Sequence, residues 1–426
     1  MPCIRALPLV VLAAGLSCLA TFNVQAQSAA KSVDDQYREG LYLRETGRPY
    51  SAIETLETIL AANPTLNRAR LEVAVAYYRT LNFAKAKAQA QTVLDDPNTP
   101  EPVRLAVLSF LKQLELDEAA SFGKPHKLDY TLSLGAVYDS NVNAGPDSAV
   151  LPGGLVLEPG STARADGGYV LQAGVTHTWL SPTPVRSGES TGRFGWTSQL
   201  GAYYKGYGRL NEYNLGVLTA ATGPVLIMGK DWRGNLNFQA DALTLGDKRL
   251  ALYSSVSPSG TWRLSTGHEL TVDGQLAYRN FTQAGDQGRD SHYNSAGVSY
   301  GGLYNKNRLT VQFGGRIFDE NAMEDRYTNN GYEVYLGGRQ NVTANVDLFG
   351  RAALRHSGYS GVEPFYGVAR REDEYRFELG ANQQIRSGWL DKWQASAIVT
   401  YIQNQANLEL YEYDRSIVQF TLGRSY

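Results

Sequence analysis

The spacing of hydrophobic residues changes once along this chain, close to residue 128. Up to that point apolar residues recur every three or four positions, which is the period of a helix that buries one face. From residue 128 onward apolar and polar residues alternate, which is the period of a β-strand with two different faces. In residues 128–138 every even-numbered position is apolar, and most odd-numbered positions carry polar residues or glycine. The pattern predicts a helical domain followed by a β domain.

The first region is predicted to form five helices, at residues 33–48, 49–62, 66–81, 84–94 and 102–116. Pro49 suits the first turn of a helix, while Asn63-Pro64 and Asp96-Pro97 are typical stops. An offset of 34 residues aligns Ala52 with Ala86, and 34 is the period of tetratricopeptide (TPR) repeats. This favours a short TPR-like array over a generic bundle of helical hairpins. Two repeats and one extra helix make a marginal array, so we expect it to dock on a neighbour.

The second region is predicted to form a fourteen-stranded antiparallel barrel. Its strands are expected near residues 128–139, 167–180, 191–205, 212–222, 231–243, 250–264, 268–281, 292–304, 308–318, 330–341, 345–357, 373–386, 392–403 and 414–426. Each has about ten residues with one apolar and one polar face, which is the length that crosses a tilted bilayer. A soluble sandwich also alternates, but it rarely keeps Arg, Asp and Glu on one face of so many long strands.

Connection lengths give the barrel an expected orientation. Short turns such as 305–307 alternate with longer loops such as 319–329, as periplasmic turns and extracellular loops do in outer-membrane barrels. An even strand number then places both ends of the barrel and the helical domain in the periplasm. The ten-residue turn Ser181–Ser190 is the exception to this alternation. The last strand ends in Val418, Phe420, Leu422 and Tyr426, which resembles the signal read by the barrel-insertion machinery, although Arg424 departs from it.

The N-terminus has the features of a secretory signal peptide. Arg5 precedes an apolar run, and Val24-Gln25-Ala26 is a small-residue cleavage site, so residues 1–26 are predicted to be removed. A lipoprotein signal at Cys18 is the alternative, but Gly15 stands where an aliphatic residue is expected. Both cysteines, Cys3 and Cys18, lie in this segment, which leaves residues 27–426 without a disulfide or a thiolate metal site. The predicted divisions are therefore a signal at 1–26, a helical domain at 27–124 and a barrel at 125–426.

Charge and motifs argue against several other functions. Without Arg5 the mature chain has 39 basic and 42 acidic side chains, so nucleic-acid binding has no electrostatic support. No phosphate-binding loop of the Walker type occurs, and the five histidines lack metal-site spacing. Residues 188–192 match G-x-S-x-G, but two prolines precede the match and a strand follows it, which predicts a turn rather than a nucleophile elbow. We expect neither an enzyme nor a cofactor.

Charged residues on the polar faces of the strands are the candidate lining of the barrel lumen. They could solvate the lumen and brace the wall through cross-strand ion pairs, or they could form a polar surface along which a client slides. The candidates are Arg233, Asp241, Asp273, Arg279, Arg316, Glu333, Arg339, Asp347, Arg351, Arg355, Glu374, Arg376 and Glu378.

The first predicted strand ends in a polar run made of Tyr138, Asp139, Ser140, Asn141 and, after a valine, Asn143. Oxygen ligands for calcium can be imagined here, but the spacing is not that of an EF-hand, and a strand-ending turn fits better. Residues 135–144 and 407–415, together with a TPR-like domain joined directly to a fourteen-stranded barrel, resemble the surface lipoprotein assembly modifier (Slam) family. That family is the outer-membrane component of type XI secretion.

The resemblance implies an outer-membrane translocon for a dedicated small client, either a surface lipoprotein or a related secreted protein. The helical repeats would receive the client in the periplasm, the barrel would pass it outward, and folding outside would prevent its return. Further expected partners are a periplasmic chaperone, the barrel-insertion machinery and outer-membrane lipid. Binding of nucleic acid is not expected. A polysaccharide exporter also joins helical repeats to a barrel, and a passive porin needs only the barrel. Both remain alternatives.

Overall fold

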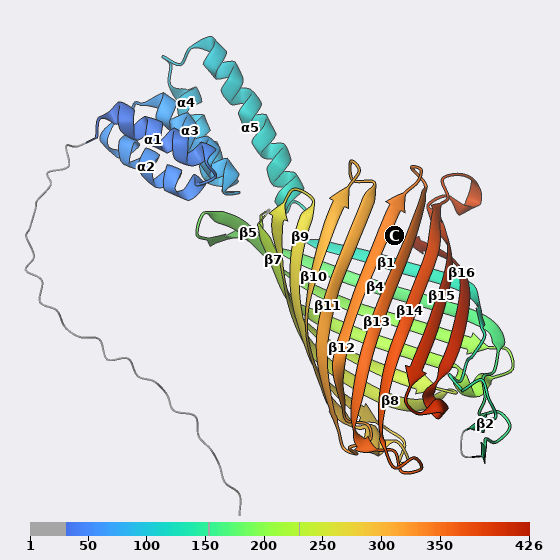
Figure 1. The fold of residues 1–426 in the computed structure, drawn as a ribbon. Coiled ribbons are helices and arrows are strands. Elements are labelled where there is room, and N and C mark those ends of the chain that lie inside the picture. The colour runs from blue at the N-terminus through green and yellow to red at the C-terminus, as the bar shows by residue number, and fades with distance from the viewer. Residues whose placement is uncertain (1–30, 152–153, 230) are drawn as a thin grey trace, which may run out of the picture.

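The computed structural model describes residues 31–151, 154–229 and 231–426, which form a helical domain and a β-barrel (Figure 1). The predicted signal peptide lies outside the described residues. Within them the helices are α1 (Val33–Glu45), α2 (Pro49–Ala62), α3 (Asn67–Arg79), α4 (Phe83–Asp95) and α5 (Glu101–Phe122). No helix in the described ranges is long and apolar enough to cross a membrane.

Local chemistry explains where the helices begin and end. The Ser32 hydroxyl accepts a hydrogen bond from the backbone N–H of Asp35 at 3.1 Å and caps α1, which stops before Gly47 at a positive φ of 81°. Helix α1 is therefore three residues shorter than predicted. Helix α5 is longer than predicted, because residues 117–122 contain no glycine or proline before Gly123. The helices pack around a core that includes Leu56, Val73 and Leu114.

The β region closes into one antiparallel barrel. In chain order its strands are β1 (His126–Asp139), β4 (Asp166–Ser187), β5 (Ser190–Tyr207), β6 (Leu215–Met228), β7 (Trp232–Leu245), β8 (Lys248–Ser265), β9 (His268–Phe281), β10 (Ser291–Tyr304), β11 (Leu309–Ala322), β12 (Asn329–Asn341), β13 (Val346–Val362), β14 (Ala369–Gln384), β15 (Trp393–Ala406) and β16 (Tyr413–Ser425). Each pairs with its sequence neighbour, and β16 closes the ring against β1. The described chain thus confirms the predicted order of five helices followed by a fourteen-stranded barrel.

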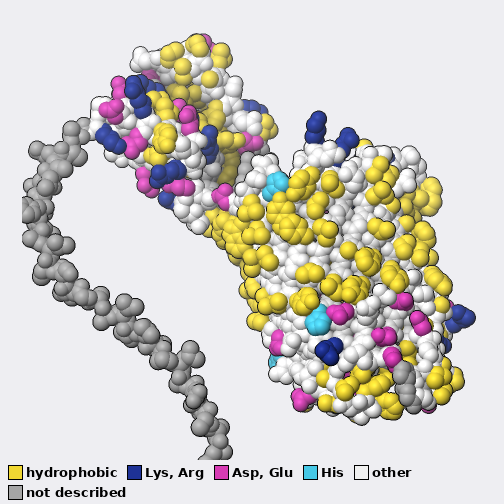
Figure 2. Space-filling view, viewed as in Figure 1, with side chains coloured by type: hydrophobic (Ala, Val, Ile, Leu, Met, Phe, Trp, Pro, Cys, Tyr) yellow, Lys and Arg dark blue, Asp and Glu magenta, His cyan; other side chains and the backbone are white. Residues whose placement is uncertain are grey.

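The outer face of the barrel is apolar. The even-numbered side chains of β1 point outward. Leu276 on β9 and Ile317 on β11 also point outward, and they are 61% and 67% exposed, respectively. Figure 2 shows apolar side chains over the visible face of the barrel, while charged side chains gather on the helical domain and toward the far end of the barrel. A closed antiparallel barrel leaves no strand edge unpaired, and apolar side chains on its outside suit contact with lipid. This is the architecture of a membrane-spanning barrel.

The helical domain lies at one end of the barrel, which we call the helix-side rim, and the opposite end is the far rim (Figure 1). The predicted ten-residue turn at 181–190 is wrong. Strands β4 and β5 continue through it, with a register shift between Leu180 and Pro184, and form a hairpin that turns at Gly188-Glu189. The hairpin extends beyond the helix-side rim toward the helices.

The loops of the far rim are shorter than predicted for the same reason. Strand β11 continues to Ala322 and β12 begins at Asn329, so the loop between them is residues 323–328. Strands β13 and β14 are separated only by residues 363–368. The β1–β4 loop remains the longest, and it contains a small two-stranded sheet of β2 (Val150–Leu151) and β3 (Leu155–Val156). The strands therefore project past the apolar surface at the far rim.

Candidate functional site

The tip of the β4–β5 hairpin caps helix α2. The N-cap residue of α2 is Arg48, whose side chain makes no capping hydrogen bond. Glu189 supplies the missing oxygens from the hairpin: its carboxylate accepts hydrogen bonds from the backbone N–H groups of Tyr50 at 2.9 Å and Ser51 at 3.3 Å, and from the Ser51 hydroxyl. These are the second and third residues of α2, whose N–H groups an N-cap side chain normally satisfies. A residue 138 positions away thus completes the helix.

Further contacts join the hairpin to the helical domain. The Tyr50 hydroxyl lies 3.0 Å from the Thr191 hydroxyl, and the Arg186 guanidinium stacks 4.0 Å from the centre of the Tyr50 ring. Arg193 lies 4.8 Å from the ring centre of Phe122, the last residue of α5. The hairpin therefore contacts both α2 and the end of α5. We call this set of contacts the hairpin joint.

The electrostatics of the hairpin joint favour an ionised Glu189. Burial alone would raise the pKa of this carboxyl, but the hydrogen bonds from Ser51 and Tyr50 and the nearby Arg48 lower it more, so its pKa lies below the ordinary value. The positive end of the α2 dipole acts in the same direction. The G-x-S-x-G match thus lies in a turn, as predicted, and its glutamate anchors a helix.

At the far rim, Asp139 fastens the first strand to the last. Its fully buried carboxylate accepts hydrogen bonds from Arg415 of β16, with Nε at 2.9 Å and Nη2 at 2.6 Å. The Tyr207 hydroxyl donates to the same carboxylate at 2.7 Å, and the Lys205 ammonium lies 3.8 Å away. Ion pairs and hydrogen bonds to charged groups are strongest when they are shielded from water. We call this set of contacts the seam latch, because it crosses the β1–β16 seam.

The other residues of the predicted motif continue the seam latch or shape the next loop. The Ser140 hydroxyl accepts a hydrogen bond from the backbone N–H of Ser416 at 2.8 Å, and the Asn141 amide donates to the carbonyl of Asp414 at 3.1 Å. Asn143 bonds to the backbone of residues 160–164 within the β1–β4 loop, and Tyr138 points outward. The motif oxygens thus bond to protein groups, and no cluster in the described ranges holds three metal-binding side chains.

The predicted lumen residues are brought together mainly as ion pairs, most of them between strands and one, Arg376–Glu374, within β14. Asp241 instead accepts hydrogen bonds from Thr219 and Gln239, Arg355 stacks on Phe318, and Glu378 lies next to Arg351 in the strand register. The pairs are Arg233–Glu269 at 2.7 Å, Arg279–Glu320 at 2.8 Å, Arg316–Asp273, Arg339–Asp347 at 2.7 Å, Arg351–Glu333 at 3.3 Å and Arg376–Glu374 at 3.1 Å. The charges on this part of the wall largely neutralise one another.

Three of these ion pairs span three strands, and in one of them a glycine makes room for the bridge. Asp273 of β9 reaches Arg316 of β11 across Gly297 of β10, which is the register partner of both. A Cβ atom at position 297 would lie 3.1 Å from a carboxylate oxygen of Asp273. Any side chain there would crowd the ion pair, so the small residue on β10 allows the longer bridge.

The other part of the inner wall is uncharged. On β15, β16, β1 and β4–β6 the inward positions between the two rims carry hydroxyl and amide side chains, glycine and apolar residues in the described strands. Representative residues are Ser133, Thr176, Gln199, Thr400 and Gln419. We call this region the neutral arc and the ion-paired wall of β7–β14 the charged arc. The lumen thus offers two chemically different surfaces along its length.

Sequence reasoning missed several partners of these sites. Glu320 lies on an extension of β11 beyond the predicted strand 308–318, and continued alternation points its side chain inward. Glu269 lies within the predicted strand 268–281 and also points inward, but it is not among the predicted lumen residues. Arg415 meets Asp139 only when β16 closes the barrel against β1, and Lys205 and Tyr207 reach Asp139 from β5, across β4. The histidines are isolated in sequence but not in space, because His126 and His177 stack with 3.0 Å between ring nitrogens on the adjacent strands β1 and β4.

Comparisons with known proteins add little to this description. No family model matches the chain, and no curated protein sequence matches it. Among the solved structures that are similar to this chain are a bacterial polysaccharide outer membrane secretin, OprD of Pseudomonas aeruginosa and a Pseudomonas aeruginosa FadL homologue. Their sequence identities to this chain are 11%, 9% and 10%. The matched regions cover 69–72% of this chain and 94–98% of the chains of those structures, each with a TM-score of 0.36. At these values the likeness carries no argument about function.

Proposed function

We propose that this protein is an outer-membrane transporter that exports a dedicated small client protein, with the helical domain receiving the client and the barrel conducting it outward. In this proposal the helix-side rim faces the periplasm and the far rim faces the outside. The hairpin joint is the observation that carries the proposal. A barrel that served only as a passive pore would not need a hairpin that extends beyond its rim to complete a separate helical domain.

Helix α5 supports a receiving role, because it has apolar side chains on two opposite faces. Val107 and Leu114 are buried against the other helices, while Leu105, Leu108 and Leu116 are about half exposed on the opposite side. An apolar face exposed to water on a helical array is suited to binding another protein. Only three residues separate α5 from β1, so a client held on α5 would lie next to the barrel mouth.

The lumen supports passage rather than storage. In the charged arc most of the inward-facing arginines are paired with a carboxylate, and the neutral arc offers hydroxyl and amide groups. Paired charges hold a passing chain weakly, because each group already has a partner and water competes for it. Such a wall suits a polymer that must move along it without being trapped.

The sequence resemblance of residues 135–144 and 407–415 to the Slam family points to the class of client. It favours a surface lipoprotein or a related secreted protein. The seam latch gives these residues a physical role in the proposal, since they keep the barrel closed at its outer end while a client passes. We infer that export is driven by folding of the client outside the cell.

The proposal is tested by deleting the gene and probing intact cells with protease or antibody for the proteins encoded beside it. We expect one such protein to disappear from the cell surface and to accumulate in the periplasm, and a plasmid copy of the gene to restore its display. A matched plasmid that encodes the barrel without residues 31–124 is the control for pore formation alone. Unchanged surface display after deletion would overturn the proposal.

A polysaccharide is the second candidate client, and the neutral arc is the observation that favours it. Hydroxyl and amide side chains can exchange hydrogen bonds with a sugar chain as it moves. The two candidates differ in what the deletion strain retains inside the outer membrane. Loss of surface polysaccharide with normal display of every surface protein would select the polysaccharide.

A further inference from the structure

The outward-facing residues of four neighbouring strands change from apolar to polar near the far rim. On β13 the change follows Leu354 and begins with His356, and on β15 it follows Tyr401 and begins with Gln403. On β14 the change begins with Asp373, the register partner of His356 and Gln405, and on β16 it begins with Ser416, opposite Tyr401, and continues with Asp414. Tyrosines are typical of the boundary between the apolar core and the headgroups of a bilayer. The polar positions therefore lie at headgroup level or just beyond it.

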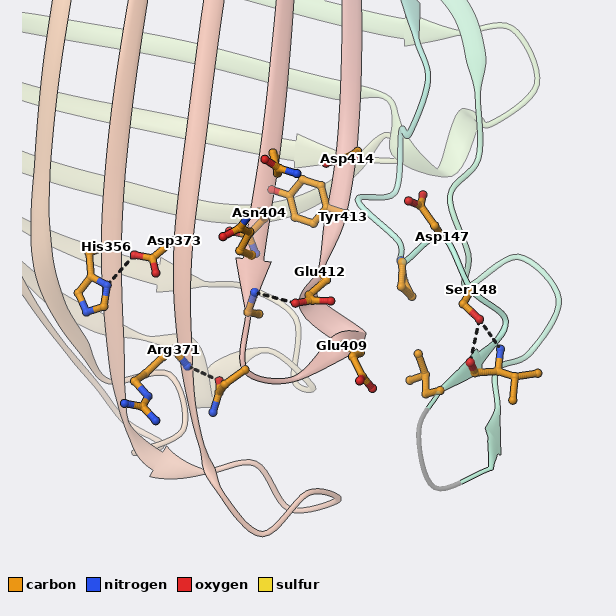
Figure 3. A pocket seen from close by; sticks show the side chains of 17 residues that line it. Asp147, Ser148, His356, Arg371, Asp373, Asn404, Glu409, Glu412, Tyr413 and Asp414 are labelled. Atoms are coloured by element: carbon orange, nitrogen blue, oxygen red, sulfur yellow. Dashed lines mark hydrogen bonds and ion pairs between the residues drawn. The ribbon is translucent and has the colours of Figure 1, made fainter.

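These polar positions form one wall of a crevice outside the barrel. The opposite wall is the segment 146–151 of the β1–β4 loop, and the enclosed volume is about 890 Å³. Figure 3 shows Asp147 and Ser148 on the loop side, and Asp373 and Glu412 on the strand side. A hydrogen bond of 2.8 Å between His356 and Asp373 fixes part of the wall. A volume of this size accommodates a ligand of several rings.

The chemistry of the crevice selects against several ligand classes. Carboxylates of Asp147, Asp373, Glu412 and Asp414 outnumber the single guanidinium of Arg371 in its lining, so a phosphate group would be repelled. No metal-binding cluster of three side chains occurs among the described residues. The carboxylate and amide oxygens of the crevice can accept hydrogen bonds from the hydroxyl groups of a ligand, and its amide N–H groups can donate hydrogen bonds to the same hydroxyl groups.

Two further features match a sugar. The side chains of Gln403 and Gln405 point into the crevice from alternate positions of β15 and make no hydrogen bond within the described structure. Pro146, Val150 and Leu151 provide an apolar surface on the loop side, against which the C–H face of a sugar ring can pack. We infer that this crevice binds a hydroxyl-rich sugar chain, carried by a glycolipid of the surrounding membrane or present as a free oligosaccharide. This goes beyond the proposed export function and does not depend on it.

The test measures binding to purified full-length protein in detergent by calorimetry. The probes are purified lipopolysaccharide and the core oligosaccharide obtained from it by removing the lipid and the phosphate groups. Gln403→Leu/Gln405→Leu removes two unpaired amides from the crevice. Asn294→Leu, an outward-facing amide on β10 that does not line the crevice, is the matched control. The heat-dependent gel shift of a folded barrel verifies that each variant is closed.

We expect both probes to bind, the double variant to weaken binding of the free oligosaccharide at least five-fold, and Asn294→Leu to bind like the unaltered protein. Binding of lipopolysaccharide without binding of the oligosaccharide would show recognition of acyl chains and overturn the inference. Equal oligosaccharide binding by all three proteins, or no binding of either probe, would overturn it as well. Tighter binding of lipopolysaccharide than of oligosaccharide, with both weakened by the double variant, would assign the site to the glycolipid.

Discussion

Glu189 at the helix-side rim and Asp139 at the far rim both fasten segments that are distant in sequence, but their surroundings differ. Asp139 is fully buried and bonds to Arg415 and Tyr207 within the closed wall of the barrel. Glu189 is partly exposed and bonds to the first turn of a helix in another domain. Because buried ion pairs cannot be replaced by water, the seam latch should open rarely. The hairpin joint can exchange its bonds with water, so the helical domain is the part expected to move.

The largest expected effect is that of Asp139→Ala. Removing the carboxylate leaves Arg415 and Lys205 buried without their counter-charge, which costs about 3–5 kcal/mol of barrel stability. We expect the variant to unfold at a lower urea concentration than the unaltered protein, with unfolding measured by the heat-dependent gel shift. In Asp139→Ala/Arg415→Leu part of the loss should be recovered, because fewer charges are stranded. Asp325→Ala, on an exposed far-rim loop, is the control, and equal shifts in both single variants would contradict the role of the seam latch.

Glu189→Gln should have a smaller effect, confined to the helix-side rim. The amide keeps one acceptor but loses the charge that complements the N-terminus of α2, which costs about 1 kcal/mol of joint stability. We expect faster proteolysis in the 123–125 connection and an unchanged barrel gel shift. Glu158→Gln, an exposed carboxyl in the β1–β4 loop, is the control. Destabilisation of the barrel itself by Glu189→Gln would show that the two rims are not independent.

Acid should weaken the same joint. The pKa of Glu189 is lowered in the folded protein, so its contribution to stability is present above the ordinary glutamate pKa of about 4.3 and is lost as pH falls through the lower folded value. Proteolysis at 123–125, measured with an acid-stable protease, should therefore rise toward the low end of a series from pH 6 to pH 3. The rise should be absent in Glu189→Gln. A rise of equal size in that variant would assign the acid sensitivity to another group.

Arg316→Gln should have the smallest effect on stability, below about 1 kcal/mol, because its ion pair with Asp273 faces the lumen. Its effect should appear in conduction instead. The unpaired carboxylate adds negative charge to the lumen, so the reversal potential in a salt gradient should shift toward cation preference. Arg38→Gln on helix α1 is the control, and an unchanged reversal potential would place Asp273 off the conduction path.

Much of this fold follows from local sequence pattern. Alternation at positions such as 232–243 and 309–317 specifies strands with one face outward, and proline and glycine positions specify most helix ends. The β4–β5 hairpin was mispredicted because Pro182 and Pro184 are typical of turns, whereas here they lie in an edge hairpin outside the barrel ladder, where a missing N–H costs little. The cap that Glu189 places on α2 could not be predicted, because neither segment carries a local sign of the other.

The seam latch at the far rim likewise could not be predicted from local sequence pattern. The polar run after Tyr138 was recognised as a turn, and its residues were singled out by resemblance alone. Its physical role depends on Tyr207 of β5 and on Arg415, 276 residues later, and the contact with Arg415 forms only when the barrel closes. Long-range contacts of this kind leave no periodic pattern in sequence, since each residue alone is compatible with an ordinary strand end.

The central claim is that a client passes from the helices into the lumen, and site-specific photocrosslinking in living cells tests it most directly. A photoreactive residue would replace Leu108 on the outer face of α5, Gln199 in the neutral arc, or Leu200, the adjacent outward-facing position on β5. We expect the same client to be captured from positions 108 and 199 and not from position 200. Continued surface display of the client with no capture from position 199 would contradict it.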